Sequence, residues 1–248
     1  MVEPRRPALK STAAPSAAIP AHHHLGFVVG FAAEARLLLR RFPAAAGSVE
    51  IAGADAGRAE KAAQALIGRG CDGLVSLGYC GALLARMAPG TILLAESIVM
   101  PDGKTAGCDD DLVAALAGAL AAAKLSYHLC SIAGSDQAVA TAADKARLAL
   151  GTEAHAVDME SHGVMRATAG AGRPMAALRV VLDPAERDLP RAALVALGPD
   201  GGLRLGALMG ALLRRPGEIL GLLALARDAR RARASLGRAA AALARGLG

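Results

Sequence analysis

Two carboxylates stand where the sequence predicts the ends of buried strands. Glu160 follows the apolar run 154–159, and Asp183 follows the run 175–182. In an open α/β sheet, ligands bind at the carboxyl ends of the strands, so acids at both points favour a catalytic site over a solvated surface. Simpler interpretations stay open for each residue. Glu160 could be an acid in the first turn of a helix, and Asp183, which precedes Pro184, could start a turn.

The pattern of apolar runs predicts the fold that would position these acids. Runs rich in Val, Ile and Leu predict strands at residues 25–30, 49–53, 73–77, 91–99, 129–133, 154–159 and 175–182. Ala-rich helical patterns lie between them, at residues 33–41, 58–69, 110–124, 142–150 and 161–171. This alternation predicts a three-layer α/β/α fold around a central mixed, mostly parallel twisted sheet. Residues 183–199, which contain three prolines, predict a loop after the last strand.

Length and composition set the class of protein. With 248 residues, 54% of them hydrophobic, the chain can bury one full core, which we expect in a single domain at residues 25–248 after a mobile tail at 1–24. The four cysteines have no zinc-ligand spacing, so we expect buried free thiols, no metal site and no cofactor. Without a secretory signal or an apolar run of membrane-spanning length, a cytoplasmic protein is expected.

The basic character of the chain belongs to its C-terminus. Residues 203–248 contain nine arginines and two acids, while the net charge of the whole chain is +6. Apolar residues recur there at helical spacing, which predicts amphipathic C-terminal helices that pack on the core and leave a basic face in solvent. A sharper interpretation is peripheral contact with an anionic inner-membrane surface. Nucleic acid is not expected as a partner, because only 2% of the residues are aromatic.

The sequence lacks the phosphate-binding motifs of two common folds. There is no Gly-x-x-x-x-Gly-Lys-Ser/Thr sequence, and the first predicted strand leads into GFAAE at residues 30–34 rather than a Gly-x-Gly-x-x-Gly turn. A P-loop and a dinucleotide-binding fold are therefore disfavoured. After the strand predicted at 73–77, the turn Gly78-Tyr79-Cys80-Gly81 could hold a ligand oxygen with its backbone N–H groups, although such a turn alone is weak evidence.

Three segments together resemble a known family. Residues 156–183, AVDMESHGVMRATAGAGRPMAALRVVLD, resemble the closing segment of the nucleoside phosphorylase and nucleosidase superfamily, in which V-[ED]-M-E precedes a helix, a Pro-led strand and R-x-x-[SL]-D. Residues 75–82 resemble its glycine-rich strand end, and residues 30–38 resemble its opening strand with a following Glu. Arginine-rich residues 212–216 and 225–230 are similar to the tail of the hopanoid-associated phosphorylases. The resemblance implies the phosphorylase/hydrolase-like fold.

The resemblance also implies roles for individual residues. Glu160 would accept hydrogen bonds from the ribose hydroxyls, and Met159 would pack on the sugar. Asp183 would protonate the purine at N7, which requires that burial raise its pKa, and Glu34 would activate water. The purine would lie against Asp136, Gln137 and Ala138, and Gly78, Tyr79, Cys80 and Gly81 would form a glycine-rich loop around nucleoside or phosphate.

The nucleophile stays open at the level of sequence. Phosphorylases of the superfamily hold phosphate with an Arg and a Ser near the glycine-rich strand end, where this chain has Ser76 and Tyr79. Without that arginine, water is favoured over phosphate as the nucleophile, unless Arg36, Arg58 or Arg179 holds the phosphate instead. Phosphate therefore remains a candidate co-substrate.

The resemblance implies a substrate and leaves two alternatives. The expected reaction is release of adenine from adenosylhopane, a nucleoside with an apolar 5′ substituent, to give ribosylhopane or phosphoribosylhopane in hopanoid biosynthesis. One alternative is a methylthioadenosine or adenosylhomocysteine nucleosidase. The other is a non-catalytic module that binds a nucleoside or a membrane. A homodimer is expected because relatives commonly pair.

Overall fold

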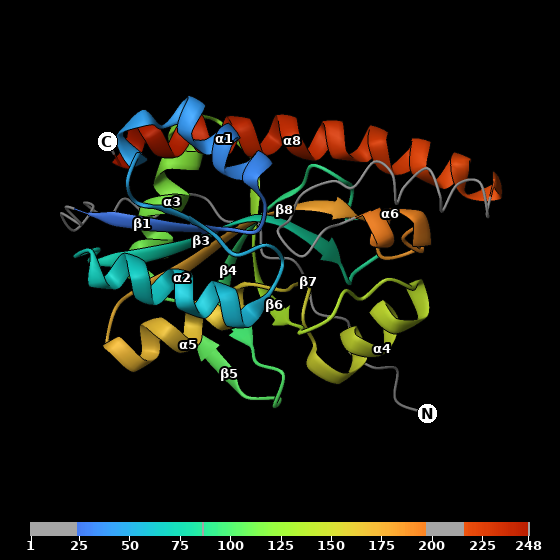
Figure 1. The fold of residues 1–248 in the computed structure, drawn as a ribbon, viewed down its shortest axis with the longest axis horizontal. Coiled ribbons are helices and arrows are strands. Elements are labelled where there is room, and N and C mark those ends of the chain that lie inside the picture. Colours follow the sequence, from blue (N-terminus) through green and yellow to red (C-terminus); the bar gives the residue numbers. More distant parts are fainter. Residues whose placement is uncertain (1–23, 86, 197–215, 248) are drawn as a thin grey trace.

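The computed structural model describes residues 24–85, 87–196 and 216–247, and these residues form the three-layer α/β/α arrangement that the sequence predicts (Figure 1). The expected N-terminal tail lies almost entirely outside them. Eight strands form one mixed sheet in the order β2-β1-β3-β7-β6-β4-β5, with β8 paired to both β3 and β4. The strands are β1 (Leu25–Val29), β2 (Val49–Ile51), β3 (Gly73–Ala82), β4 (Ile92–Val99), β5 (Thr105–Gly107), β6 (Tyr127–Gly134), β7 (Ala156–Asp158) and β8 (Met175–Asp183).

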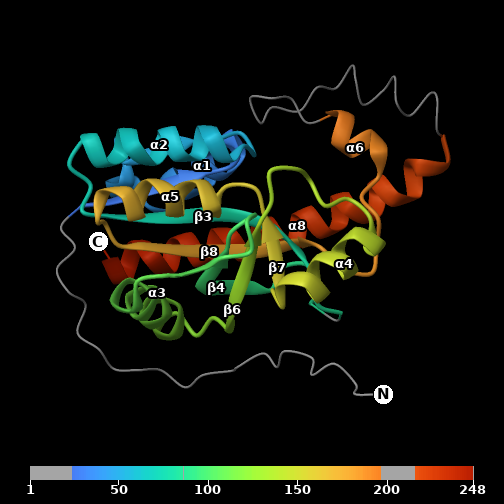
Figure 2. The ribbon, with the colours of Figure 1, turned by 90° about the horizontal axis from the view of Figure 1, so that it is seen from below.

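Helices cover both faces of the sheet. They are α1 (Ala32–Arg41), α2 (Ala56–Gly68), α3 (Asp110–Ala122), α4 (Ala142–Thr152), α5 (Ser161–Ala171), α6 (Arg191–Ala196) and α8 (Ile219–Leu247). Figure 1 shows α1 and α8 above the sheet and α2 and α5 below it; α2 packs on α5, and α8 packs on α1 and α3. Figure 2 shows α4 at the same end of the sheet as α6 and the start of α8.

The core lies on the two faces of the sheet because strand side chains alternate. In β1, Phe27 and Val29 pack into the cluster formed with α1, α3 and α8, and Val28 packs into the cluster formed with α2 and α5. The close packing of α2 on α5 depends on a glycine. A Cβ atom at Gly163 would lie 2.2 Å from the carbonyl oxygen of Ala56.

Side-chain caps fix the starts of three helices. Asp55 accepts a hydrogen bond from the backbone N–H of Arg58 at the start of α2, and Asp109 does the same for Leu112 at the start of α3. Thr141 caps α4. Each such cap stabilises its helix by about 1 kcal/mol, so these short polar residues define where the helices begin.

The structure corrects the expected elements at three places. The short strand β5, at the end of the sheet order, is not indicated by the sequence pattern. Helix α6 lies inside the stretch 183–199 that was expected to be a loop. Strand β3 continues to Ala82, five residues past its expected end at Leu77, because its glycine-rich end pairs with β7 and β8.

The C-terminal expectation is met in part. Residues 219–247 form one amphipathic helix, α8, whereas residues 203–215 of the expected helical region lie outside the described residues. All four cysteines are buried and free, which confirms that expectation. Within the described ranges, no helix is both long and apolar enough to cross a bilayer.

Candidate active site

Asp183 and Glu160 line the same cavity, which has a volume of about 150 Å³. Asp183 is the last residue of β8, and Glu160 is the residue before α5. The other residues around the cavity come from the ends of β3, β7 and β8 and from the segments that follow β1, β2, β6, β7 and β8. They are Phe31, Ala54, Tyr79, Cys80, Gly81, Gln137, Ala138, Val139, Val157, Asp158, Met159, Leu182 and Leu189.

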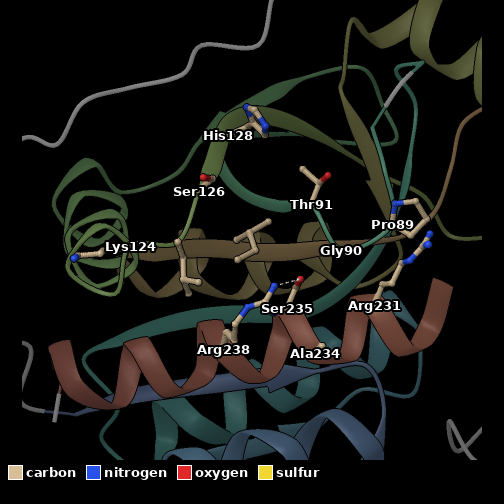
Figure 3. A pocket seen from close by; sticks show the side chains of 12 residues that line it. Pro89, Gly90, Thr91, Lys124, Ser126, His128, Arg231, Ala234, Ser235 and Arg238 are labelled. Carbon is tan, nitrogen blue, oxygen red and sulfur yellow. Dashed lines mark hydrogen bonds between the residues drawn. The ribbon is translucent and has the colours of Figure 1, made fainter. Parts of the chain in front are cut away.

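Two larger cavities lie elsewhere, along α8. One, of about 650 Å³, is lined by α8, the start of β4 and the segment before β6, and it includes Lys124, Arg231 and Arg238 (Figure 3). The other, of about 540 Å³, lies between α1 and α8. Neither cavity has a carboxylate in its lining. We assign the smaller cavity as the candidate active site because it alone of the three combines acids with convergent strand ends.

An irregularity in the pairing of β3 with β8 sets the position of Asp183. Cys80 pairs with Val181, but the next residue, Gly81, pairs with Asp183, so Leu182 is an extra residue on β8. Such a bulge redirects the side chains that follow it. Burial raises the pKa of the Asp183 carboxyl above its usual value, and the adjacent Lys145 opposes that increase. Its Oδ1 atom is buried and has no hydrogen-bond partner among the described residues.

Lys145 of α4 is fully buried and contacts the other carboxylate oxygen of Asp183. Its Nζ lies 2.5 Å from Asp183 Oδ2 and donates to the carbonyl oxygens of Pro184, at 2.9 Å, and Arg187, at 2.7 Å. An ammonium group has three N–H donors, so all of them have acceptors here. The loop after β8 therefore folds around this one cation.

Glu34 is a further buried acid, at the first turn of α1. Its Oε2 accepts a hydrogen bond from the backbone N–H of Phe31 at 2.7 Å, and its Oε1 accepts one from Tyr79 at 3.0 Å. Burial raises the pKa of Glu34 from 4.5 to about 7; the Phe31 N–H and the charge of Arg179 oppose this increase. Phe31 and Tyr79 line the cavity and Glu34 does not, so its carboxylate lies behind them.

Arg179 is a buried cation that neutralises the acids Asp158 and Glu160 of the cavity lining. Its Nε donates to Asp158 Oδ2 at 2.6 Å, and its Nη2 lies 3.5 Å from Glu160 Oε2. Nη2 also donates to the hydroxyl oxygens of Ser76 and Ser161. Burial raises the pKa of Glu160, Arg179 opposes that increase, and the charges of Asp158 and Glu34 add to it.

Two glycines leave space for these charged groups. A Cβ atom at Gly30 would lie 2.7 Å from Glu160 Oε1 and 3.3 Å from Glu34 Oε2. A Cβ atom at Gly78 would lie 2.7 Å from Arg179 Nη1 and 2.8 Å from Glu34 Oε1. Any side chain at either position would enter the carboxylate cluster. Gly30 and Gly78 thus allow the buried charged side chains to approach the backbone closely.

The structure brings together most of the residues that the sequence singles out. The cavity lining includes Asp183, Met159, Glu160, Gln137, Ala138, Tyr79, Cys80 and Gly81. Glu34 and Gly78 lie behind it. Asp136 lies outside it as well: its side chain is 70% exposed, and its Oδ1 is 3.0 Å from Nε2 of His162. The purine contact expected of Asp136 stays a prediction, and this geometry gives it no support.

Lys145 and Asp158 are the residues that sequence reasoning missed. Asp158 belongs to the V-D-M-E motif, and a carboxylate next to a candidate ribose ligand was a usable signal. Lys145 carried no such signal, because an isolated lysine in a helical pattern is normally a solvated residue. In the described ranges, no group of three or more His, Cys, Asp and Glu side chains is placed to hold a metal ion.

The sequence matches the phosphorylase superfamily over residues 51–214, which is more than half of the chain. The chain therefore belongs to this superfamily of enzymes, and the resemblance of residues 75–82 and 156–183 is confirmed at that level. The closer resemblance to hopanoid-associated phosphorylases stays a prediction. A comparison with curated protein sequences finds no match.

Solved structures of similar fold include those of nucleosidases. A futalosine hydrolase mutant of Helicobacter pylori strain 26695 has a TM-score of 0.63 and 17% identity, covering 77% of this chain and 98% of that one. The 5′-methylthioadenosine/S-adenosyl homocysteine nucleosidase of Campylobacter jejuni has a TM-score of 0.61 and 16% identity, covering 76% and 95%. The S-adenosylhomocysteine nucleosidase of Streptococcus pyogenes has a TM-score of 0.60 and 20% identity, covering 77% and 95%. At these identities the likeness shows the fold.

Proposed function

We propose that the protein cleaves the N-glycosidic bond of an adenine nucleoside, with water as the nucleophile. The observation that carries this proposal is the convergence of Glu160 and Asp183 on one cavity, with the Oδ1 atom of Asp183 left without a partner. A buried oxygen of a carboxyl group is costly to leave unsatisfied, so this atom fits a ligand group such as purine N7.

The proposed reaction assigns one step to each acid. Glu160 accepts hydrogen bonds from the ribose hydroxyls. Asp183 gives the proton on Oδ1 to N7 while the electron pair of the C1′–N9 bond moves into the purine, and the sugar becomes oxocarbenium-like. Water then attacks C1′ and loses a proton to Glu34, whose pKa of about 7 suits a general base near neutral pH. Because Glu34 lies behind the cavity lining, this step needs the water to reach it past Phe31 or Tyr79.

The charge of the site favours water over phosphate. A phosphate dianion at this point would face three buried acids, Glu34, Asp158 and Glu160. Arg179 is the cation that contacts two of them, and it is fully buried. The arginines that could have compensated do not enter the cavity lining: Arg36 is exposed, and Arg58 donates to the carbonyl oxygen of Gly53.

Adenosylhopane is the substrate we propose, on the strength of the C-terminal sequence resemblance. The apolar lining residues Phe31, Val139, Leu182 and Leu189 are compatible with a hydrophobic 5′ substituent. Methylthioadenosine and adenosylhomocysteine are the alternative substrates, and the names of two structural neighbours favour testing them. The expected dimer and the cytoplasmic location stay predictions.

A substrate that is mostly hydrocarbon would reside in a membrane, so we also propose that the α8 face contacts an anionic bilayer. At the start of α8, Ile219, Leu220 and Leu223 are 46%, 78% and 62% exposed. Further along the helix, the cavity between α1 and α8 is rich in arginine, and no acid among the described residues pairs with those side chains. They are Arg40, Arg41, Arg230, Arg233 and Arg238. Exposed apolar residues on the same helix as arginines that have no acidic partner are typical of interfacial helices.

The experiment that tests the reaction is chromatographic detection of released adenine. Adenosylhopane, methylthioadenosine and adenosylhomocysteine are each incubated with the protein, with and without phosphate. Asp183→Asn is the inactive control, and Asp72→Asn, at a half-exposed acid outside the cavity lining, is the matched active control. Adenine release without phosphate supports hydrolysis, and a strict phosphate requirement overturns it. Binding of a nucleoside with no product in any arm would favour the non-catalytic binding module.

A further inference from the structure

Lys145 is the buried charged group that the reaction above does not use. We infer that it is a positioning residue for Asp183: it holds Oδ2, so that Oδ1 is the oxygen presented to the base, and it stabilises the carboxylate left when the proton moves to N7. This inference rests on the proposed function, in which Asp183 is the proton donor, and it assigns the residue that orients Asp183.

The burial of Lys145 cannot be explained by packing of α4. Lys145 is fully buried, and it is the one buried residue of that helix. Lysine is almost never fully buried unless its charge is paired. Here each N–H of the ammonium group meets an oxygen of the segment 183–187: the carboxylate of Asp183 and the carbonyls of Pro184 and Arg187. The helix thus delivers a single cation to the end of β8.

The contact with Oδ2 decides which oxygen of Asp183 is free. Oδ2 lies 2.5 Å from the lysine Nζ, whereas Oδ1 is buried without a partner and its residue lines the cavity. A carboxyl group that is held at one oxygen loses rotational freedom about its terminal bond, so the other oxygen keeps one direction. A general acid needs this fixed direction, because proton transfer requires hydrogen-bond distance to the acceptor.

The charges around Asp183 leave Lys145 as the group that stabilises the developing carboxylate. Arg187, in the loop after β8, also favours the ionised form, but it is paired with Asp228 of α8, whose charge disfavours it. Cys80 of β3 is a thiol whose pKa burial raises well above its usual value, so it is neutral. The attraction between Lys145 and Asp183 increases as the proton leaves Oδ1, and an interaction that strengthens in this way lowers the barrier.

The test compares Lys145→Met with the wild type and with Arg147→Met, a change on the exposed side of the same helix. We expect Lys145→Met to lower kcat by at least about tenfold with little change in KM, because binding by Glu160 is untouched. We also expect the alkaline limb of the kcat profile to move to higher pH, because a buried carboxyl without its ammonium partner is a weaker acid. Ethylamine should partly restore the activity of Lys145→Ala but not that of Asp183→Asn.

Distinct results would overturn the inference. An unchanged kcat and pH profile in Lys145→Met would show that Lys145 does not act on Asp183. A lower kcat with an unmoved alkaline limb and no amine rescue would assign it a merely structural role. If the wild type releases no adenine, the proposed function fails instead. The inference is then decided by carbon-13 NMR titration of the Asp183 carboxyl, assigned with Asp183→Asn, whose pKa must rise in Lys145→Met.

Discussion

The buried carboxylate cluster at the cavity, formed by Glu34, Asp158 and Glu160, and the basic face of α8 are both densely charged, but they differ in burial. Arg179 has no exposed surface and makes contacts with Asp158, Glu160 and Ser76. Arg230 and Arg233 on α8 are exposed and unpaired within the described ranges. Coulomb interactions are strong where water is excluded and weak where it is present. The same residue type is therefore part of the folded core at one place and free to meet a partner at the other.

Asp183→Asn should have the largest effect on activity. The amide cannot protonate N7, so we expect kcat to fall by about 10²- to 10⁴-fold, the usual contribution of a general acid. Nucleoside affinity should change little, because Glu160 and Met159 remain. The measurements are single-turnover adenine release and equilibrium binding of the nucleoside. Wild-type turnover in this variant would mean that another group protonates the base.

Arg179→Met tests how much the buried ion pairs of Arg179 contribute to stability, compared with an exposed arginine of α8. Removing one partner of a buried ion pair leaves the other charge uncompensated, which typically costs about 3–5 kcal/mol of stability. We expect a large fall in Tm for this variant and almost none for Arg233→Met on α8, since exposed substitutions usually change stability by about 0.5 kcal/mol or less. Thermal unfolding of both proteins checks the difference. Equal Tm values would contradict the importance of burial here.

The pH dependence of activity and stability should reveal Glu34. With a pKa of about 7, Glu34 is protonated in acid, so kcat/KM should fall about tenfold per pH unit below that value. The folded-state pKa lies above the usual 4.5, so its contribution to stability is greatest below pH 4.5 and is lost as the pH rises through about 7. Glu34→Gln should remove both dependences, whereas Glu60→Gln, a surface change, should keep them. A flat wild-type profile from pH 5 to 8 would exclude Glu34 as the base.

Charge reversal on α8 should have the smallest effect on the isolated enzyme. Each arginine near an anionic bilayer contributes about 1 kcal/mol, so Arg230→Glu with Arg233→Glu should weaken binding to phosphatidylglycerol vesicles by about 30-fold or more. Adenine release from soluble methylthioadenosine should not change if that nucleoside is turned over. The matched control is Lys61→Glu on α2 with Arg69→Glu at the residue that follows this helix, and sedimentation with phosphatidylcholine vesicles is the uncharged reference. Equal sedimentation of both double variants would reject the membrane contact.

The local pattern of the sequence predicts most strands and helices because their apolar periodicity reflects which face is buried. The long glycine-rich strand was the main shortfall: its pairing extends past Leu77 because of its neighbours, β7 and β8. Helix α6 was hidden by the prolines around it. Elements that depend on partners distant in the chain are thus the ones that the pattern does not give.

By itself, the sequence determined the alternation of strands and helices, the membership of the superfamily and the acids at the ends of two strands. These are properties of residue type and spacing. The tertiary structure decided that Lys145 contacts Asp183 and that Glu34 lies behind Tyr79. It also decided that Leu182 is an extra residue in the pairing of β8 with β3, which redirects the side chain of Asp183. Such contacts join residues far apart in the chain, and the packing that buries them also determines their pKa values and partners.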